Sequence, residues 1–417
     1  MENSLLEIAN FAKSNSGYYA QKYLNYEINT MEDFYKLPLS DSKMFLERQE
    51  DLLTTVPNPK SSYVFSTGGS LSKPKNVHLS YDEFHRNVHF HGLSYKKAGL
   101  NSEDRVATFG IPGTKTSEFS VYLGLEETGC FILPIGIYDD FEYIYSVLKE
   151  HNINSLLVMP TDLISLINYL NSNNLSLNIE KIITGGESLP KNSKEFISNS
   201  IGTKHFGSTF QGMDFGTVGY NDGKIDLKFA GSRPVYCINN DDLYVEVLNS
   251  NNDSVTDQIG EIVVTNTFRK LSPIVRYKTG DYGIKFLDPK NNKAYIRLMG
   301  RVGSKPKVGG EVLDLDVLND FISDKSFFTG RFQTVITKQN NLDKVLIKVE
   351  VVPNVDFSYE KEFEDLIEFL KNNHTKLDNQ LKYKYIQPID VLFDTEENIN
   401  FYKSGNTKKI IKVVDER

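Results

Sequence analysis

Residues 66–75 have the composition of an anion-binding loop. They read Ser-Thr-Gly-Gly-Ser-Leu-Ser-Lys-Pro-Lys and directly follow a strand-like run at 61–65. Glycine, serine and threonine after a strand allow a sharp turn and present backbone N–H and hydroxyl donors, and two lysines add positive charge. The segment predicts a triphosphate loop, although it is not a Walker A loop, which would continue as Gly-Lys-Ser/Thr into a helix. A polar hairpin loop with solvated lysines is the alternative.

Two further segments suit a nucleoside. Residues 184–190 read Thr-Gly-Gly-Glu-Ser-Leu-Pro after a predicted strand, and their glycines let a flat ring lie against the backbone. The alternative is a strand-to-helix turn with Glu187 in the first helical turn. Residues 276–281 read Arg-Tyr-Lys-Thr-Gly-Asp. On a tight turn, the Asp281 carboxylate can accept hydrogen bonds from both hydroxyls of a ribose. A plain β-turn is the alternative there.

Two segments near the C-terminus complete the set. Residues 300–311 carry four glycines where the composition changes, which predicts a linker whose backbone can swing. Residues 403–415 form a lysine-containing tail. A frayed basic terminus is the alternative for this tail.

The elements that must position these segments alternate between strands and helices. The short apolar runs are strand-like and have helical patterns between them; they lie at 105–109, 130–135, 155–158 and 181–184. This alternation predicts an α/β domain with a mainly parallel sheet. Ser80 is the predicted N-cap of a helix that begins at Tyr81. Residues 243–298 predict an antiparallel subdomain, and the remainder of the chain predicts an α+β unit of about 115 residues, with a helix from Tyr359.

Composition argues against several classes of function. The chain has 417 residues, 47 Lys+Arg and 55 Asp+Glu, so the net charge of −8 gives no reason to expect nucleic acid as a partner. Two cysteines cannot build a disulfide framework, and without a Cys-x-x-Cys pair a structural zinc site is not expected. No window reaches about 18 apolar residues and the N-terminus does not read as a signal peptide, so we expect a cytoplasmic protein without a membrane partner.

The order and spacing of the five segments resemble those of the acyl-adenylate-forming ligases, the superfamily of acyl-CoA synthetases, adenylation domains and luciferases. The likeness is greatest to the phenylacetate–CoA ligase branch, which shares Pro-x-x-Arg-Tyr-x-Thr-Gly-Asp at 273–281 and a Lys…Val-x-Asp tail at 409–415. The resemblance spans about residues 60–415 and implies an α/β fold. It implies a large N-terminal adenylation domain (1–300) with parallel-sheet subdomains and a β-rich subdomain, and a small mobile α+β C-terminal lid domain (301–417) with a hinge near Gly303.

The resemblance also implies an ATP site. The family's phosphate loop reads Thr-Ser-Gly-Thr-Thr-Gly-Lys-Pro, and residues 67–74 fit that frame with Leu71 for a threonine and Ser72 for a glycine. The loop would hold the β- and γ-phosphates, the Gly-Gly-Glu segment would flank adenine, the aspartate would bind ribose, and the arginine after the glycine-rich turn would contact ribose or phosphate. The implied residues are Ser66, Thr67, Gly68, Gly69, Ser70, Ser72, Lys73, Gly185, Gly186, Glu187, Asp281 and Arg301.

The magnesium ligand has two candidate positions. The family places a glutamate after aromatic-Gly-Ser/Thr-Thr, and residues 206–210 copy that pattern with Phe210 where the acid belongs. A second frame, residues 210–220, places Asp214 at the acid position. Because magnesium needs an oxygen anion, we prefer Asp214.

The catalytic residue that the resemblance implies is Lys409. It stands six residues before Asp415, as the family's adenylation lysine stands before its terminal aspartate. Its ammonium group would stabilise the charge that develops between the carboxylate and the α-phosphate. A one-residue slip would assign this role to Lys408.

The implied reaction joins a carboxylate to MgATP, giving an acyl-AMP and pyrophosphate, and then passes the acyl group to an acceptor. The acceptor is a thiol of CoA or of carrier-protein phosphopantetheine, or else an amine. The carboxylate attacks phosphorus directly, so catalysis consists of positioning and charge neutralisation. The implied substrate-binding residues are Glu118, Phe119, Tyr122, Gly212 and Met213.

Two of these residues are aromatic, which favours an aryl acid. The compact length resembles branch members that serve siderophore or antibiotic pathways. The remaining alternative is a non-catalytic acyl- or nucleotide-binding homologue, which Phe210, Leu71 and Ser72 favour.

Overall fold

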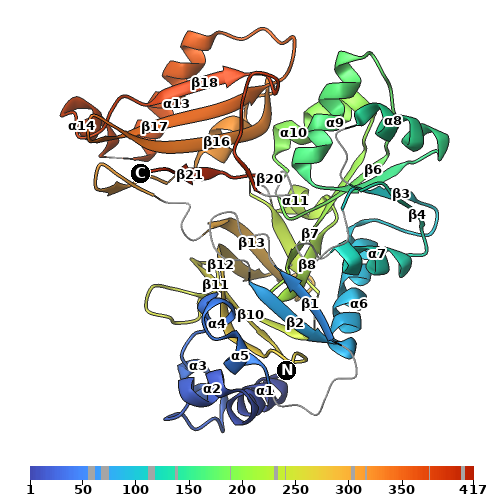
Figure 1. Cartoon of the computed structure of the whole chain (residues 1–417), viewed down its shortest axis with the longest axis vertical. Coiled ribbons are helices and arrows are strands. Elements are labelled where there is room, and N and C mark those ends of the chain that lie inside the picture. The colour runs from blue at the N-terminus through green and yellow to red at the C-terminus, as the bar shows by residue number, and fades with distance from the viewer. Residues whose placement is uncertain are drawn as a thin grey trace.

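The computed structural model contains a large unit and a smaller unit, the latter coloured orange to red at the upper left of Figure 1. The large unit ends with residue 301 and the small unit begins with residue 306. The structure describes residues 1–54, 62–66, 75–110, 118–136, 140–187, 189–229, 233–239, 241–301, 306–314, 317–374, 376–404 and 409–417.

The described part of the large unit is built on an eleven-stranded mixed sheet, ordered β10-β11-β12-β13-β9-β8-β7-β6-β5-β3-β4. The strands are β3 (Arg105–Thr108), β4 (Phe131–Pro134), β5 (Ser155–Val158), β6 (Lys181–Gly185), β7 (His205–Gly212), β8 (Gly216–Asn221), β9 (Val235–Ile238), β10 (Leu243–Leu248), β11 (Ile259–Asn266), β12 (Ile274–Leu287) and β13 (Ala294–Arg301). Strands β4, β3, β5, β6 and β7 run parallel, and the others pair antiparallel. The α/β fold class is therefore confirmed.

The antiparallel strands predicted over residues 243–298 are confirmed, and they are continuous with the parallel part of the sheet. The β7–β8 hairpin and β9 connect the antiparallel strands to the parallel ones in a continuous ladder. Strand pairing between segments distant in sequence leaves no local signal, so the antiparallel stretch looked like a unit of its own.

Helices cover the parallel part of the sheet (Figure 1). They are α6 (Tyr81–Ala98), α7 (Glu118–Glu126), α8 (Phe141–Glu150), α9 (Pro160–Ser172), α10 (Lys191–Ile201) and the short α11 (Lys224–Lys228). The predicted start of α6 is confirmed: the Ser80 hydroxyl accepts a hydrogen bond from the Glu83 backbone N–H, and the Glu83 carboxylate accepts one from the Ser80 backbone N–H. Helix α9 begins with Pro160, which suits the first helical position.

Short helices at the N-terminus pack against the antiparallel strands at the bottom of Figure 1. They are α1 (Glu2–Asn15), α2 (Gly17–Lys22), α3 (Met31–Lys36), α4 (Lys43–Leu46) and α5 (Gln49–Leu52). Buried Arg276 ties this layer to β12, because its guanidinium pairs with Glu246 at 3.0 Å and donates to the Leu37 carbonyl at 2.9 Å. Arg276 has a φ of +44°, and burial raises the pKa of Glu246. The arginine of the Arg-Tyr motif therefore serves the fold.

The small unit has a four-stranded sheet, ordered β18-β17-β16-β21, among its described residues. Its elements are β14 (Lys307–Val308), β15 (Glu311–Val312), α12 (Leu318–Ser323), β16 (Phe328–Gln339), β17 (Leu342–Val351), α13 (Tyr359–Asn373), α14 (Leu377–Lys382), β18 (Asp390–Asp394), β19 (Lys403–Ser404), β20 (Lys409–Ile410) and β21 (Val413–Asp415). Helix α13 begins at Tyr359, as predicted. The proposed hinge residue Gly303 lies outside the described residues.

The small unit is docked on α9 through a buried ionic cluster, which we call the latch: Arg331, Glu350 and Glu396 of the small unit with Ser165 and Asn168 of α9. Arg331 pairs with Glu350, which is fully buried, and its Nη2 lies 2.8 Å from Glu396 Oε2. From α9, Ser165 donates to Glu396 at 2.7 Å and Asn168 to Glu350 at 3.0 Å. Although burial opposes it, the Arg331 guanidinium holds the pKa of Glu396 at about 2. The latch therefore holds charged side chains at the contact between the small unit and α9, and separating the two would expose these charges to water.

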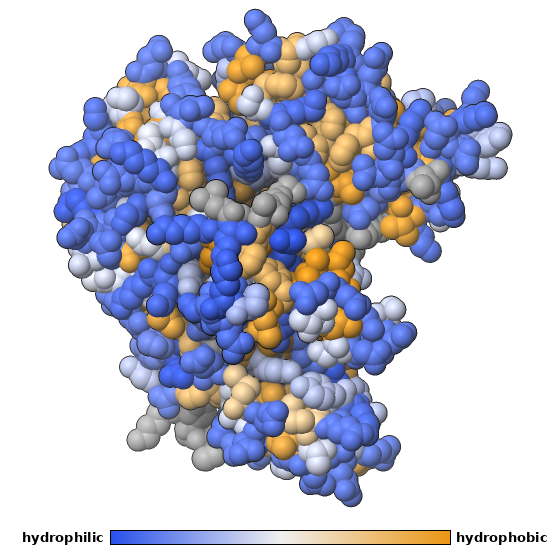
Figure 2. Space-filling view, turned by 180° about the vertical axis from the view of Figure 1, so that it is seen from behind, coloured by the Kyte–Doolittle hydropathy of each residue, from blue (hydrophilic) through white to orange (hydrophobic). Residues whose placement is uncertain are grey.

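Hydrophobic residues gather toward the middle of the molecule when it is seen from behind, and the outer rim is mostly hydrophilic (Figure 2). Among the residues that the structure describes, no helix has both the length and the apolar character needed to cross a bilayer.

Candidate active site

Three polar side chains from distant parts of the chain meet at the turn between β7 and β8. Asp214 lies in this turn, and its side chain is 7% exposed. Its Oδ2 pairs with the Lys75 ammonium and accepts a hydrogen bond from the Tyr277 hydroxyl at 2.5 Å, while Lys75 lies 3.2 Å from that hydroxyl. Burial, and then the Asp214 carboxylate, raise the pKa of Tyr277. Asp214 is therefore held between a cation and a protonated phenol.

This environment suits a carboxylate that would help hold a magnesium ion brought by a nucleotide. Among the described residues, both hydrogen bonds to the Asp214 carboxylate go to Oδ2, and magnesium is commonly bound through one or two carboxylates together with substrate phosphates. Within the described ranges, no cluster of three or more His, Cys, Asp or Glu side chains could hold a metal by itself. The residues present thus fit a shared protein–nucleotide site better than an all-protein cage.

Phe210, the competing position for the metal acid, is a core residue. It is 8% exposed, and its ring packs edge-on against Phe215 and tilted against Tyr236, at centroid distances of 6.1 and 5.6 Å. An aromatic side chain in that position offers no metal ligand. The geometry favours the frame that uses Asp214.

The hairpin of β1 (Ser62–Ser66) and β2 (Asn76–Ser80) brackets the predicted phosphate loop. Ser66 pairs with Asn76 in the ladder, and its hydroxyl donates to the Asn76 side chain at 2.5 Å. Lys75 is the last residue of the predicted loop and directly precedes β2, and its ammonium group pairs with Asp214. The other predicted loop residues, Thr67, Gly68, Gly69, Ser70, Ser72 and Lys73, lie outside the described residues.

Asp281 and Arg301 are brought together by the pairing of β12 with β13. They are directly opposite in the ladder, and Arg301 Nε lies 3.3 Å from Asp281 Oδ1. The Asp281 side chain is 16% exposed, whereas that of Arg301 is 67% exposed. The Asp281 backbone N–H is held by the Thr279 hydroxyl at 3.1 Å. The carboxylate and the guanidinium thus lie side by side on two neighbouring interior strands of the sheet. Asp281 lies within β12, so its predicted placement on a tight turn is wrong.

The Gly-Gly-Glu segment follows β6 directly. Gly185 pairs with Thr209 of β7, and Gly186 has a φ of +76°, which a residue without a side chain adopts readily. The Glu187 carboxylate accepts hydrogen bonds from the backbone N–H and the hydroxyl of Thr161, at 3.1 and 2.8 Å. Glu187 therefore caps the N-terminus of α9 from outside, and the alternative with Glu187 in the first turn of the following helix is wrong, because α10 begins at Lys191.

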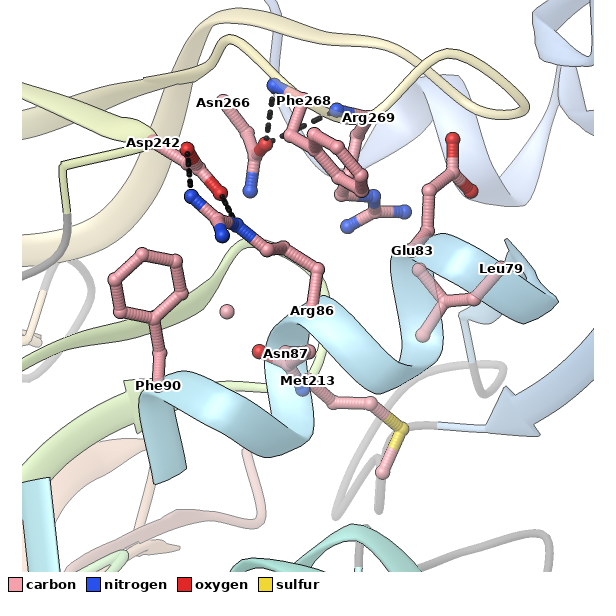
Figure 3. Close-up of a pocket in the computed structure, with 11 residues that line it drawn as sticks. Leu79, Glu83, Arg86, Asn87, Phe90, Met213, Asp242, Asn266, Phe268 and Arg269 are labelled. Carbon is pink, nitrogen blue, oxygen red and sulfur yellow. Dashed lines mark hydrogen bonds and ion pairs between the residues drawn. The ribbon is translucent and has the colours of Figure 1, made fainter. Parts of the chain in front are cut away.

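The predicted acyl-binding residues lie on α7 and on the β7–β8 hairpin. Phe119 is 40% exposed, and its ring lies 5.6 Å from that of Phe84. The Tyr122 hydroxyl donates to the Gly110 carbonyl at 2.6 Å. Gly212 ends β7, and the Met213 side chain lines a cavity beside α6 (Figure 3). Helix α7 begins at Glu118.

The catalytic lysine predicted from the tail lies at the start of β20. Lys409 pairs with Ser404 of β19, and Figure 1 draws β20 between the two units. Lys408 lies outside the described residues, as do the other residues of the β19–β20 turn. The described parts of the tail therefore lie in paired strands, β19 with β20 and β21 with β16.

Two polar residues of the Asp214 cluster were not singled out from the sequence. Lys75 was part of the predicted phosphate loop and Tyr277 part of the Arg-Tyr motif, but neither was assigned a contact. They are 139 and 63 residues from Asp214 in the sequence. A buried carboxylate requires hydrogen-bond or ionic partners, but the sequence gives no signal that identifies Lys75 and Tyr277 as these partners.

Comparisons with known proteins agree with this architecture. No protein-family model matches the sequence. Indoleacetate–lysine synthetase of Pseudomonas savastanoi is 23% identical over 307 residues, 72% of each chain. The structure of 2-hydroxyisobutyryl-CoA ligase in its postadenylation state superposes with a TM-score of 0.75 and 17% identity, over 100% of this chain and 88% of that one. The chain has the fold of the acyl-adenylate-forming ligases. The o-succinylbenzoate CoA synthetase of Bacillus subtilis, bound to its acyl-adenylate, gives 0.55 and 14%, over 84% and 67%.

The arrangement of the two units also resembles a particular state of the CoA ligase. The postadenylation structure gives a TM-score of 0.75, whereas the thioesterification structure of the same ligase gives 0.63 over the same shares of both chains. The small unit is therefore placed more as it is in the former structure than as it is in the latter.

Proposed function

We propose that this chain is an AMP-forming carboxylate ligase, which activates an aryl carboxylic acid with MgATP and passes the acyl group to a thiol of CoA or of carrier-protein phosphopantetheine. The observation that carries the proposal is the pairing of Asp214 with Lys75 and Tyr277. Tyr277 lies on β12, four residues before Asp281, which pairs with Arg301 of β13. These groups bring cations and anions from the β7–β8 turn and from the interior strands β12 and β13 of one sheet, where the five sequence segments would converge on a nucleotide. Secondary metabolism is the proposed setting.

In this proposal each polar group has one task. Asp281 accepts the ribose hydroxyls, and Arg301, largely exposed beside it, meets ribose or phosphate oxygens. The ammonium of Lys75 faces Asp214 and extends the positive charge of the phosphate loop. Asp214, with the nucleotide phosphates, would hold magnesium, which neutralises phosphate charge when bound. The attacking carboxylate belongs to the substrate, so these groups orient the reactants and stabilise charge.

An amine acceptor is the second candidate, and one finding favours it. The curated relative found in the sequence comparison is named for joining indoleacetate to lysine, which is an amine. Indoleacetate is also an aryl acid, so this relative supports the proposed substrate class while leaving a choice of acceptor. A carboxylate panel of benzoates, phenylacetates, indoleacetate, fatty acids and amino acids, scored by pyrophosphate release, tests the first half-reaction. Adding CoA or lysine in turn and identifying the product by mass spectrometry selects the acceptor. A chain that binds but releases no pyrophosphate with any acid would be a non-catalytic homologue.

We also propose that residues 1–300 form the adenylation domain and residues 301–417 a lid that rotates at a hinge near Gly303. The support is that β13 ends at Arg301, β14 begins at Lys307, and each side has its own hydrophobic core. The docked position observed would then be one of two that the lid adopts during turnover.

Asp281→Ala is expected to weaken ATP binding at least about tenfold, because two hydrogen bonds to a charged acceptor are lost. Isothermal calorimetry on the full chain measures this affinity. Asp257→Ala, at an exposed turn elsewhere in the same sheet region, is the matched control and should bind as the unmodified chain does. Unchanged affinity in Asp281→Ala would remove Asp281 from the site.

Asp214→Asn is expected to raise several-fold the magnesium concentration that half-saturates pyrophosphate release, because an amide oxygen is a poorer ligand than a carboxylate. The amide keeps the shape of the side chain, so the Tyr277 contact can persist. Phe210→Leu changes the residue at the competing position for the metal acid and should leave the magnesium dependence unchanged. The reverse pattern in the two variants would restore the frame that uses position 210.

A further inference from the structure

A group of polar side chains is buried between α6, α7 and β7. It lies on the side of the sheet that carries the predicted acyl-binding residues of α7. His91 and Ser120 are each 2% exposed. The His91 Nε2 lies 3.2 Å from the Asn87 amide nitrogen and 3.4 Å from the Ser120 hydroxyl, and its Nδ1 lies 3.5 Å from the Tyr95 hydroxyl. Burial lowers the pKa of His91 to about 4, so the imidazole is neutral at physiological pH. The group is polar and carries no charge there.

Gln211 of β7 brings an unused acceptor to this group. Its side-chain amide forms a hydrogen bond with His91, and its Oε1 is buried with no other hydrogen-bond partner among the described residues. Thr209, two residues earlier on the same face of the strand, also has a buried hydroxyl with no such partner. A buried carbonyl left unpaired is destabilising, and native proteins contain few of them. A ligand that donates a hydrogen bond would remove this cost.

The location connects this group with the proposed reaction centre. A side-chain carbon built at Gly185 would lie 3.4 Å from Thr209 Oγ1 and 3.8 Å from Gln211 Nε2, so Gln211 stands next to the Gly-Gly-Glu segment. Asp214 follows Gln211 by three residues on the same hairpin. Gln211 therefore lies between the segment proposed to flank adenine and the His91 ring.

Asn87 extends the group to the cavity beside α6. Figure 3 shows Asn87 and Met213 near each other below the α6 ribbon, whereas Arg86 turns to the opposite side and pairs with Asp242 at 2.6 Å. Ser120 reaches the group from α7, next to Phe119. The polar group thus adjoins residues that the resemblance assigns to acyl binding.

We propose that Asn87, His91, Ser120 and Gln211 form a polar acyl subsite, which binds an uncharged hydrogen-bond donor, a hydroxyl or an N–H, on the part of the substrate remote from its carboxylate. This inference rests on the proposed function and narrows its substrate class to aryl acids that carry such a donor. The subsite is neutral, so it offers nothing to balance an ammonium or a second carboxylate. A site built to hydrogen-bond a substrate group rejects the analogue that lacks the group, because its own polar atoms are then left unpaired.

The test uses pairs of acids that differ by one donor: phenylacetate with its hydroxylated forms, benzoate with hydroxybenzoates, and indole-3-acetate with its N-methyl derivative. We expect kcat/KM for pyrophosphate release to favour the donor-bearing member of at least one pair by roughly tenfold or more. Gln211→Leu should abolish that preference while the apolar member is still used. His89→Gln, on the exposed face of the same helix, is the control and should keep the preference. Equal use of both members of every pair by the unmodified chain, or a preference that survives in Gln211→Leu, would overturn the proposal.

Calorimetric binding of the same pairs to the full chain with ATP separates this inference from the proposed function. A donor preference in binding that disappears in Gln211→Leu supports the subsite even if no pyrophosphate is released, and in that case only the ligase activity is refuted. Pyrophosphate release without any donor preference refutes only the subsite, and failure of every pair to bind refutes it as well. His91→Phe repeats the test from the other side of the group, after circular dichroism has shown that each variant is folded.

Discussion

Lys409→Ala is expected to lower acyl-adenylate formation by roughly 10²–10³-fold while the chain stays folded, because a preorganised positive charge at the reacting phosphate would be lost. The prediction rests on the spacing of Lys409 and Asp415 and on the position of β20 between the two units (Figure 1). Pyrophosphate release under single-turnover conditions measures the effect. Circular dichroism and the unfolding midpoint verify that the fold persists.

The control for this prediction is the neighbouring Lys408→Ala, which should retain most of the rate. Loss in Lys408→Ala with a normal rate in Lys409→Ala would shift the assignment by one residue, and normal rates in both would reject it. Acyl transfer from a supplied acyl-adenylate should be normal in Lys409→Ala, because that step does not need the adenylation lysine.

Arg331→Met is expected to destabilise the docked small unit by about 3–5 kcal/mol, because it leaves the Glu350 carboxylate buried without its countercharge. The fully buried state of Glu350 makes this effect much larger than that of a surface ion pair. The loss of stability is measured by urea unfolding, with hydrogen exchange of the β16 and β17 amides as the probe. This probe reports the unfolding of the small unit alone.

Two variants make the latch prediction sharper. Lys36→Ala removes an exposed ion pair with Glu32 on α3 and should leave the urea midpoint unchanged. Arg331→Met combined with Glu350→Leu should recover part of the lost stability, because the fully buried Glu350 charge is removed together with its partner, while the less buried Glu396 keeps its hydrogen bonds from Ser165 and Asn168. A normal urea midpoint in Arg331→Met would show that the latch contributes little to the stability of the docked small unit.

The elements with local signals were predictable from the sequence. The Ser80 cap, the start of α13 at Tyr359 and the apolar parallel strands each depend on residues within one turn or one strand, and the structure confirms them. The resemblance extended this to the fold as a whole, because the order of five short motifs is a property of the whole chain. The closer likeness to the phenylacetate–CoA ligase branch stays a prediction.

The contacts that build the site depend on long-range pairing and could not be predicted. Lys75 and Asp214 are 139 residues apart, and Glu187 caps a helix whose first turn precedes it by 26 residues. In the latch, Asn168 of α9 contacts residues that are 182 and 228 positions away. None of these partners has a distinctive pattern of its own, because lysine, tyrosine and asparagine are also common on surfaces. Only the folded sheet selects which of them meet.

Thr161 is touched from two directions. Glu187 holds its backbone N–H and hydroxyl, and Arg331 donates to its carbonyl at 3.4 Å. A nucleotide bound against Glu187, as proposed above, and a rotation of the small unit that withdraws Arg331 would both change the contacts of the first turn of α9. Because such coupling is reciprocal, filling the nucleotide site would alter the free energy of swinging the small unit by as much as that swing alters nucleotide affinity.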